Sequence, residues 1–195
     1  MFLNIQHGFL PLGLAALLLG ACGRTGESAS ATPDLCAVAP QPAEAPAEAT
    51  ALIEVPLGGR VKYEFDPVTN RLKVDRILPD GFAYPAHYGA FPCTMAGDEN
   101  PLDVLVVTNE ALLPATLIRV RPVALLRMRD SGRMDDKVIT VPAGSADSSV
   151  SVELRHALER FFSSYKPGGN VVVGAWEGSA EARAVLQSAL VGPKK

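Results

Sequence analysis

Acidic residues gather in one short segment of this 195-residue chain, directly before an apolar run. Asp98, Glu99 and Asn100 lie on a predicted turn that leads into Leu102–Val107, a run typical of a strand buried on both faces, and Asp103 is the second residue of that run. Hard divalent cations such as Mg²⁺ prefer oxygen ligands, and carboxylates that converge at a strand edge supply them. The segment predicts a metal site, although a solvated acidic turn would have the same composition.

A second group of charged residues lies further along the chain and adds cations to the carboxylates. Asp130 and Asp135 follow the β-rich run Thr116–Leu126, and Lys137 closes the cluster. Further carboxylates, amines and phenols occur at Glu54, Lys62, Glu64, Tyr84, Tyr88, Tyr165 and Lys166. Carboxylates hold divalent cations, while Lys and Arg pair with phosphate oxygens. Their alternation therefore predicts a site that binds metal ions and phosphate together.

The elements that must position these residues are mostly short strands. Turn signals rich in Gly, Pro and Asp separate the strands predicted at Leu52–Val55, Val61–Phe65, Leu72–Asp75, Leu102–Val107, Thr116–Leu126 and Val138–Val141. Closely spaced strands of this kind favour a small closed barrel. The C-terminal part predicts a helix with one apolar face between Val152 and Tyr165, a strand at Val171–Val173, and a last helix to Leu190 with Ser179 as its N-cap.

In order and spacing, these motifs resemble the family I inorganic pyrophosphatases. The similarity spans almost all of the segment from Ile53 to Lys166. It is carried by Ile53–Pro56, Lys62–Glu64, Val74–Arg76, Tyr84–Gly89, Asp98–Asp103, Arg121–Val123, Asp130–Lys137 and Phe161–Lys166. Each motif alone is weak, but their shared order is a strong signal. The resemblance implies an α+β, mainly β fold, with a five-stranded OB-like barrel flanked by C-terminal helices.

The resemblance also implies a role for each matched residue. The implied metal ligands are Asp98, Asp103, Asp130, Asp135 and Glu54. The implied substrate-binding residues are Lys62, Glu64, Arg76, Tyr88, Lys137, Tyr165 and Lys166, and the residues nearest the chemistry are Asn100, Tyr88, Lys62 and Arg76. Tyr84 matches a phenol of the same cavity whose role is either packing or binding. The implied cofactor is Mg²⁺, with Mn²⁺ as an alternative, and the implied reaction is hydrolysis of pyrophosphate to two phosphates by in-line attack of a metal-bound hydroxide.

One position departs from the family pattern. Asn100 stands where the family has an Asp that is thought to take the proton of the attacking water, and an amide cannot act as a base near neutral pH. A positioned base is typically worth about 10²–10⁴-fold in rate. Three hypotheses stay open: a working pyrophosphatase with reduced activity, in which the metals suffice or Glu99 replaces the base; a catalytically weakened pyrophosphate- and metal-binding lipoprotein; and a phosphohydrolase for another small substrate.

The N-terminal residues differ in composition from the rest of the chain. Phe9–Leu19 is apolar but too short to span a bilayer as a helix, and Leu19–Cys22 resembles the bacterial lipobox. We therefore expect a signal peptide over 1–21, a lipidated Cys22 and a protein held on a membrane surface in the bacterial cell envelope, at the periplasmic face. A cytoplasmic protein with a misplaced start is the alternative. Residues 22–50, rich in Ala, Pro and Glu, predict a linker that ends along the surface of a domain over 51–195.

The remaining cysteines and the net charge bear on compartment and partners. If Cys22 carries lipid, Cys36 and Cys93 form an even pair that could be a disulfide in an oxidising compartment; two separate thiols are the alternative. The net charge is −3 and no basic patch stands out, which argues against nucleic acid as a partner. The expected partners are pyrophosphate and a membrane surface, and a homo-oligomer is left open.

Overall fold

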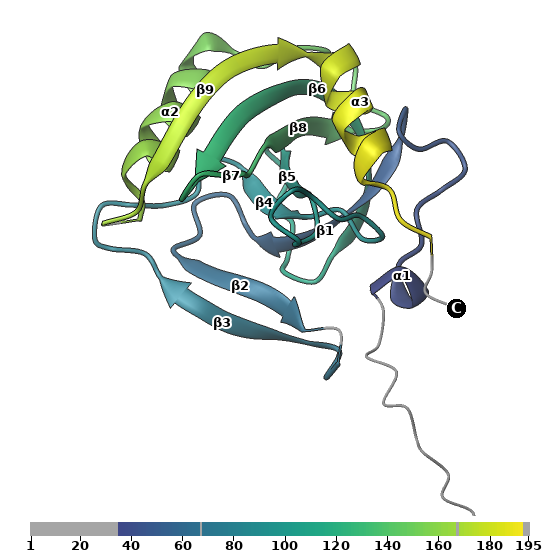
Figure 1. Cartoon of the computed structure of the whole chain (residues 1–195), viewed down its shortest axis with the longest axis horizontal. Coiled ribbons are helices and arrows are strands. Elements are labelled where there is room, and N and C mark those ends of the chain that lie inside the picture. Colours follow the sequence, from purple (N-terminus) through teal and green to yellow (C-terminus); the bar gives the residue numbers. More distant parts are fainter. Residues whose placement is uncertain (1–34, 67, 167, 193–195) are drawn as a thin grey trace, which may run out of the picture. The chain divides into compact units, whose positions relative to one another are not determined.

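The computed structural model describes residues 35–192 with the exception of 67 and 167 (Figure 1). The predicted signal peptide and Cys22 lie outside the described residues. A closed ring of strands forms the centre of the fold, each strand hydrogen-bonded to the next and the last to the first: β1 (Ala49–Val55), β4 (His87–Ala90), β5 (Asp103–Val106), β8 (Lys137–Pro142) and β6 (Leu117–Asp130). The prediction of a mainly β fold with a five-stranded barrel is confirmed.

The other elements surround this ring. Two strands extend the sheet beyond β6, namely β7 (Arg133–Met134) and β9 (Val171–Gly178). A separate antiparallel hairpin is formed by β2 (Val61–Asp66) and β3 (Arg71–Ile77). Figure 1 shows this hairpin on the opposite side of the ring from the two C-terminal helices, α2 (Val152–Ser164) and α3 (Ser179–Ala189). The hairpin forms one wall of a cavity, and the ring forms the wall that faces it.

The long strand β6 joins the ring to its outer strands because it bends. Its register against β8 shifts between Pro122 and Ala124, and its register against β9 shifts between Leu126 and Met128. Proline cannot donate to a strand ladder, and a bulge bends the strand that contains it. One continuous segment thus pairs with β1, β8, β7 and β9, and its C-terminal end brings Asp130 to the rim of the cavity.

Several element boundaries differ from the sequence prediction. Strand β6 runs past Leu126 to Asp130; the prediction stopped short because Arg127, Arg129 and Asp130 are charged and Met128 is the one apolar residue among them. Strand β4 was not predicted; it lies so close to β1 that a Cβ on Gly89 would stand 1.8 Å from the carbonyl oxygen of Leu52. The N-cap of α3 is Gly178 and not Ser179, and the Glu181 carboxylate accepts the Gly178 N–H at 3.1 Å.

The last part of the predicted linker packs on the domain. A short helix, α1 (Leu35–Val38), precedes β1. The side-chain amide of Gln41 then accepts the N–H of Thr50 at 2.9 Å and donates to the carbonyls of Thr50 and Pro92, each at 2.8 Å. One side chain therefore ties the segment before β1 to the segment that follows β4.

A buried histidine on β4 holds the loops that follow β1 and β5, the two strands paired with β4. His87 is 2% exposed, its Nδ1 accepts the N–H of Leu57 at 3.0 Å, and its Nε2 lies 3.0 Å from the carbonyl oxygen of Glu110. Because Nδ1 already accepts a hydrogen bond, the neutral ring with its proton on Nε2 satisfies both partners. Burial lowers the pKa of His87, and the bond to Glu110 opposes this only in part.

Candidate active site

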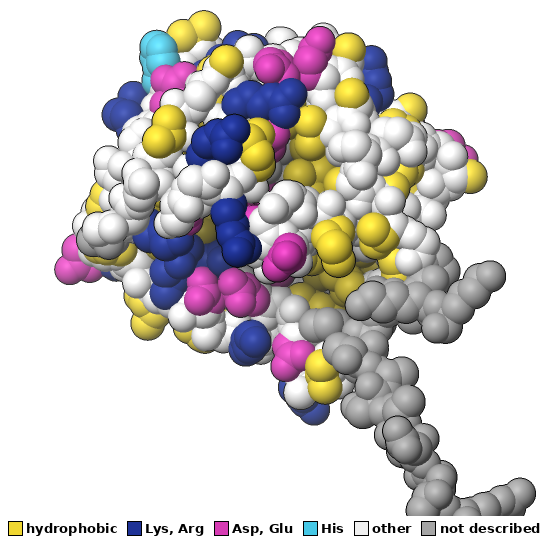
Figure 2. Space-filling model, in the orientation of Figure 1, with side chains coloured by type: hydrophobic (Ala, Val, Ile, Leu, Met, Phe, Trp, Pro, Cys, Tyr) yellow, Lys and Arg dark blue, Asp and Glu magenta, His cyan; other side chains and the backbone are white. Residues whose placement is uncertain are grey.

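A cavity of about 410 Å³ lies between the hairpin, the ring and the end of α2. Figure 2 shows Lys, Arg, Asp and Glu side chains side by side above the hairpin. The cavity is lined by every residue to which the sequence assigned catalysis, substrate binding or metal binding: Glu54, Lys62, Glu64, Arg76, Tyr88, Asp98, Asn100, Asp103, Asp130, Asp135, Lys137, Tyr165 and Lys166. The fold thus brings together residues that are spread over much of the chain.

The deepest charge in the cavity belongs to Lys137, which is 2% exposed. It is the parallel-strand partner of Asp103 across β5 and β8, and its ammonium group donates to the carboxylates of Asp103 and Asp135. Burial lowers the pKa of Lys137, but the two carboxylates outweigh that effect and the pKa is raised. Burial also raises the pKa of Asp135, to about 6, although Lys137 opposes this. At neutral pH a buried cation therefore stands between two carboxylates.

The loop before β5 carries Asp98 and Asn100 in a locally bonded turn. Asp98 Oδ1 accepts the backbone N–H of Asn100 at 3.1 Å, and Oδ2 accepts the side-chain Nδ2 of Asn100 at 2.8 Å. Glu99, the hypothetical replacement base, adopts a φ of 70° at the turn; it is exposed and is not among the residues that line the cavity. The geometry therefore gives no support to Glu99 as the base.

The hairpin supplies cations from adjacent strands. Lys62 and Arg76 are cross-strand partners, and the Lys62 ammonium lies 2.8 Å from Glu64 and 3.2 Å from Asp75. The Arg76 guanidinium lies over the ring of Tyr165, 5.4 Å from its centroid. Its Nε atom is buried and has no hydrogen-bond partner among the described residues. Since buried donors are almost always satisfied, this N–H is suited to an anionic ligand.

Glu54 lies on the hairpin side of the cavity, and an ion pair between Lys166 and Asp130 lies on the far side. Glu54 on β1 is 8% exposed and accepts the backbone N–H of Phe65 at 3.0 Å. Burial raises its pKa to about 7, and the bond from Phe65 opposes that rise. On the far side, Lys166 lies 2.5 Å from Asp130, and the Lys166 side chain is 38% exposed where that of Lys137 is 2% exposed. The cavity therefore contains one buried ammonium group and one that contacts solvent.

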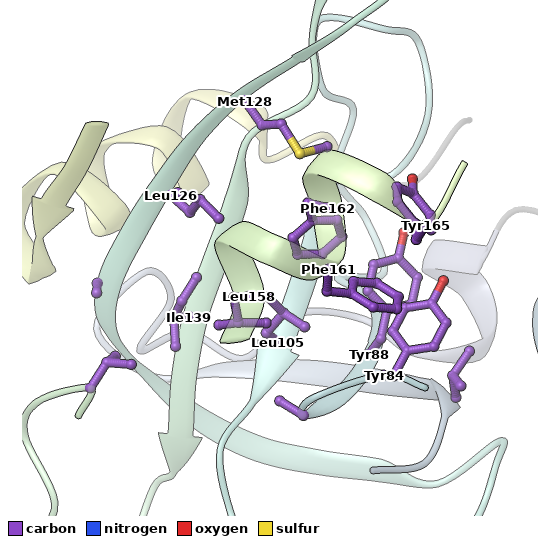
Figure 3. Packing of buried hydrophobic residues seen from close by; sticks show 14 of the residues in the cluster. Tyr84, Tyr88, Leu105, Leu126, Met128, Ile139, Leu158, Phe161, Phe162 and Tyr165 are labelled. Atoms are coloured by element: carbon purple, nitrogen blue, oxygen red, sulfur yellow. The ribbon is translucent and has the colours of Figure 1, made fainter. Parts of the chain in front are cut away.

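An aromatic cluster supports the floor of the cavity. Figure 3 shows Tyr84, Tyr88, Phe161 and Tyr165 packed together at the end of α2. The ring of Phe161 lies 4.7 Å from that of Tyr84 and 4.9 Å from that of Tyr165, centroid to centroid. Tyr84 is 2% exposed and does not line the cavity, so packing is the role that the geometry favours for it. Burial raises the pKa of both Tyr88 and Tyr165, which keeps their hydroxyls protonated as donors.

Asp75 and Leu35 line the cavity, although the sequence analysis gave neither of them a role. Asp75 lies within the matched motif Val74–Arg76, and its contacts with Lys62 and Arg76 show that it orients both cations. Charged residues at every second position of β3, from Arg71 through Lys73 to Asp75, were a signal that could have identified it. Leu35 on α1 also lines the cavity, and nothing in its residue type or in its linker-like surroundings predicts this position.

The carboxylates of the cavity are suitable donors for a hard divalent cation. Asp98, Asp103, Asp130 and Asp135 come from different elements and line the same cavity. Among the described residues no three acidic, histidine or cysteine side chains form a metal centre as they stand. The ammonium groups of Lys137 and Lys166 bind three of these aspartates instead. Carboxylate oxygens are the ligands that Mg²⁺ prefers, so the donor set fits such an ion.

Comparisons with known proteins agree with these observations. Residues 51–191 match the family model for inorganic pyrophosphatase. The inorganic pyrophosphatase of Saccharolobus solfataricus is 37% identical over 164 residues, which cover 78% of this chain and 95% of that protein. The crystal structure of inorganic pyrophosphatase from Thermus thermophilus is 35% identical with a TM-score of 0.72, over 75% of this chain and 91% of that one. The crystal structure of an inorganic phosphatase from Anaplasma phagocytophilum is 38% identical, also with a TM-score of 0.72. The match covers 76% of this chain and 95% of that one.

The expected location in the cell envelope is wrong. Relatives from Zea mays and Chlamydomonas reinhardtii, 37% and 39% identical, are named soluble inorganic pyrophosphatases. No helix among the described residues is long and apolar enough to cross a membrane. The location was inferred from a short apolar segment before a cysteine, which is a local pattern, and that segment lies outside the described residues. The comparisons give no support either for the hypothesis of a binding lipoprotein.

Proposed function

The chain belongs to the inorganic pyrophosphatase family, and we propose that its charged cavity hydrolyses pyrophosphate to two phosphates with the help of bound Mg²⁺ or Mn²⁺. The observation that carries the proposal is that four aspartates suited to metal ions, Asp98, Asp103, Asp130 and Asp135, line the same cavity as four Lys and Arg side chains. Pyrophosphate has a dense negative charge that repels a nucleophile, so a site for it must provide positive charge on several sides.

The aspartates would hold the metal ions. Asp103 lies at the start of β5, between the loop that bears Asp98 and the strand β8 beside Asp135, so it would hold metal ions together with both of these residues. Asp130 and Glu54 would serve outer positions of the same cavity. When bound there, divalent cations would neutralise phosphate charge and make water a better nucleophile.

The cations of the chain would hold the two phosphoryl units. Arg76 offers a buried Nε–H that has no hydrogen-bond partner in the described part of the chain, and Lys62 lies beside it on the hairpin. Lys137 and Lys166 reach the cavity from the opposite side, and each would exchange a carboxylate partner for a phosphate oxygen. The protonated hydroxyls of Tyr88 and Tyr165 are further donors to phosphate oxygens. Together these groups would hold pyrophosphate in the same cavity as the carboxylates.

Asn100 would orient the attacking water without removing its proton. Its Nδ2 donates to Asp98, which leaves Oδ1 free to accept one hydrogen bond from water. An amide has no basic site near neutral pH, so the proton must pass to another acceptor, such as a phosphate oxygen or solvent. The expected consequence is a slower reaction near neutral pH than a carboxylate at this position would permit.

Phosphate release from pyrophosphate in the presence of Mg²⁺ or Mn²⁺ tests the proposal directly. Asp103→Ala should abolish both hydrolysis and tight metal binding, because it removes the carboxylate that lies between the other proposed ligands. Asp80→Ala is the matched control, since Asp80 is fully exposed and pairs with Arg60 outside the cavity. Unchanged metal affinity in the Asp103 variant would place the metal site elsewhere, and a wild-type protein without hydrolysis would refute the proposed function.

A further inference from the structure

The loop over residues 91–102, here called the metal loop, leaves β4 and returns to β5, and it carries Asp98 and Asn100. A buried hydroxyl closes its base. Thr94 Oγ1 donates to the carbonyl of Phe91 at 2.6 Å and accepts the N–H of Leu102 at 2.8 Å. The two ends of the metal loop are therefore held together by one side chain, independently of the acidic residues at its tip.

The same base is attached to two other parts of the chain. Cys93 is joined to Cys36 in a disulfide, with their Cα atoms 4.6 Å apart. The carbonyl of Cys93 accepts the N–H of Val191 at 2.9 Å, and the N–H of Met95 donates to the carbonyl of Ala189 at 2.8 Å. The segment at the start of the metal loop is thus fixed covalently to α1 and by hydrogen bonds to the end of α3.

The segment around α1 is itself held against the site. Leu35, next to Cys36, lines the cavity, and Gln41 bonds the carbonyl of Pro92 directly before Cys93. Both residues precede the region that matches the family model, which begins at 51. The covalent attachment of the metal loop therefore comes from a part of this chain that lies outside the matched region.

We infer that the Cys36–Cys93 disulfide is a positioning element for the metal loop and that it raises the affinity of the cavity for its metal ions. The inference rests on the proposed function in so far as Asp98 is a metal ligand. A loop whose base is already fixed loses less conformational freedom when its carboxylate is ordered by a cation, and such preorganisation strengthens binding. Opening the disulfide removes the covalent link at Cys93, and the base of the loop is then held by hydrogen bonds and by the packing of Phe91 and Leu102 in the core.

Calorimetric titration of Mn²⁺ into the metal-free protein tests this inference. The titration compares oxidised wild type, wild type reduced with TCEP, and the variant Cys36→Ala/Cys93→Ala, each shown to be folded by its fluorescence and circular dichroism. Reduction and the double substitution should both weaken Mn²⁺ binding by about five-fold or more, the usual lower range for coupling between two sites. The apparent affinity for Mn²⁺ in hydrolysis should change by the same factor, with little change in kcat at saturating metal.

Two sets of variants separate positioning from general stability. Leu158→Ala destabilises the other side of the core, where Leu158 packs near Leu105 and Ile139 (Figure 3), and it should leave Mn²⁺ affinity unchanged. Thr94→Val should weaken Mn²⁺ binding because it opens the base of the loop, and Thr94→Ser should restore it.

Unchanged Mn²⁺ affinity after reduction, equal weakening by Leu158→Ala, or unfolding of the reduced protein would each overturn the inference. A failure of oxidised wild type to bind Mn²⁺ or to hydrolyse pyrophosphate would instead overturn the proposed function. The two failures are therefore distinguishable.

Discussion

Replacing Lys137 by Met should change stability in a way that depends on the metal ion. Lys137 is 2% exposed and contacts Asp103 and Asp135, whose side chains are 19% and 17% exposed. Removing one partner of a buried ion pair typically costs about 3–5 kcal/mol, because a buried charge is left uncompensated. The aspartates keep some contact with solvent, so the expected loss in EDTA is at the lower end, about 3 kcal/mol.

Saturation with metal should recover part of this loss. In the wild type the ammonium group competes with a cation for the two carboxylates, and Met does not compete. Stabilisation by a ligand grows as RT ln(1 + [L]/Kd), from about 2.7 kcal/mol at 100 times Kd to about 4.1 kcal/mol at 1,000 times Kd. If Lys137→Met binds Mg²⁺ ten-fold more tightly, the gap to wild type should narrow by about 1.4 kcal/mol at the same Mg²⁺ concentration.

Urea unfolding followed by the fluorescence of Trp176, the only tryptophan in the chain, measures both quantities in EDTA and in Mg²⁺. Lys166→Met is the control, because Lys166 is 38% exposed and its pair with Asp130 should contribute at most about 1 kcal/mol. An equal loss of stability for Lys137→Met in EDTA and in Mg²⁺ would refute the competition between ammonium and metal. A variant as stable as wild type in EDTA would refute the burial argument itself.

Three further predictions concern residues elsewhere in the chain. The folded protein holds His87 neutral with a lowered pKa, so stability should fall as pH drops through the ordinary histidine value of about 6.5. Urea midpoints between pH 7.5 and 5 should show this fall, and His87→Gln should reduce it. Asn100→Asp should raise hydrolysis near neutral pH by about ten-fold or more by supplying a base, while Glu99→Gln should matter little; the reverse pattern in a rate assay would move the base to Glu99. Cys36 and Cys93 should appear as a linked pair in non-reducing peptide maps, and reduction should lower the free energy of unfolding by about 4 kcal/mol for a sequence separation of 57. Two freely alkylated thiols would contradict the pairing.

Much of the fold followed from local patterns that do not depend on tertiary contacts. Apolar runs between Gly and Pro turns predicted most strands of the ring, and the helical spacing of apolar residues predicted α2. Predictions failed where local pattern and final position diverge. The last residues of β6 and the short strand β4 form because neighbouring strands pair with them. The location in the cell envelope was inferred from a local motif alone.

The sequence by itself identified most of the charged and phenolic side chains that line the cavity, because carboxylates, amines and phenols occur in a characteristic order and spacing. Only the tertiary structure decided how deeply each side chain is buried and which charges surround it. Tyr84 and Tyr88 belong to one motif, yet only Tyr88 lines the cavity. Lys137 becomes a buried cation because β5 and β8 place it opposite Asp103. Burial and charge depend on the sum of all neighbours in space, and residues far apart in the chain provide most of them.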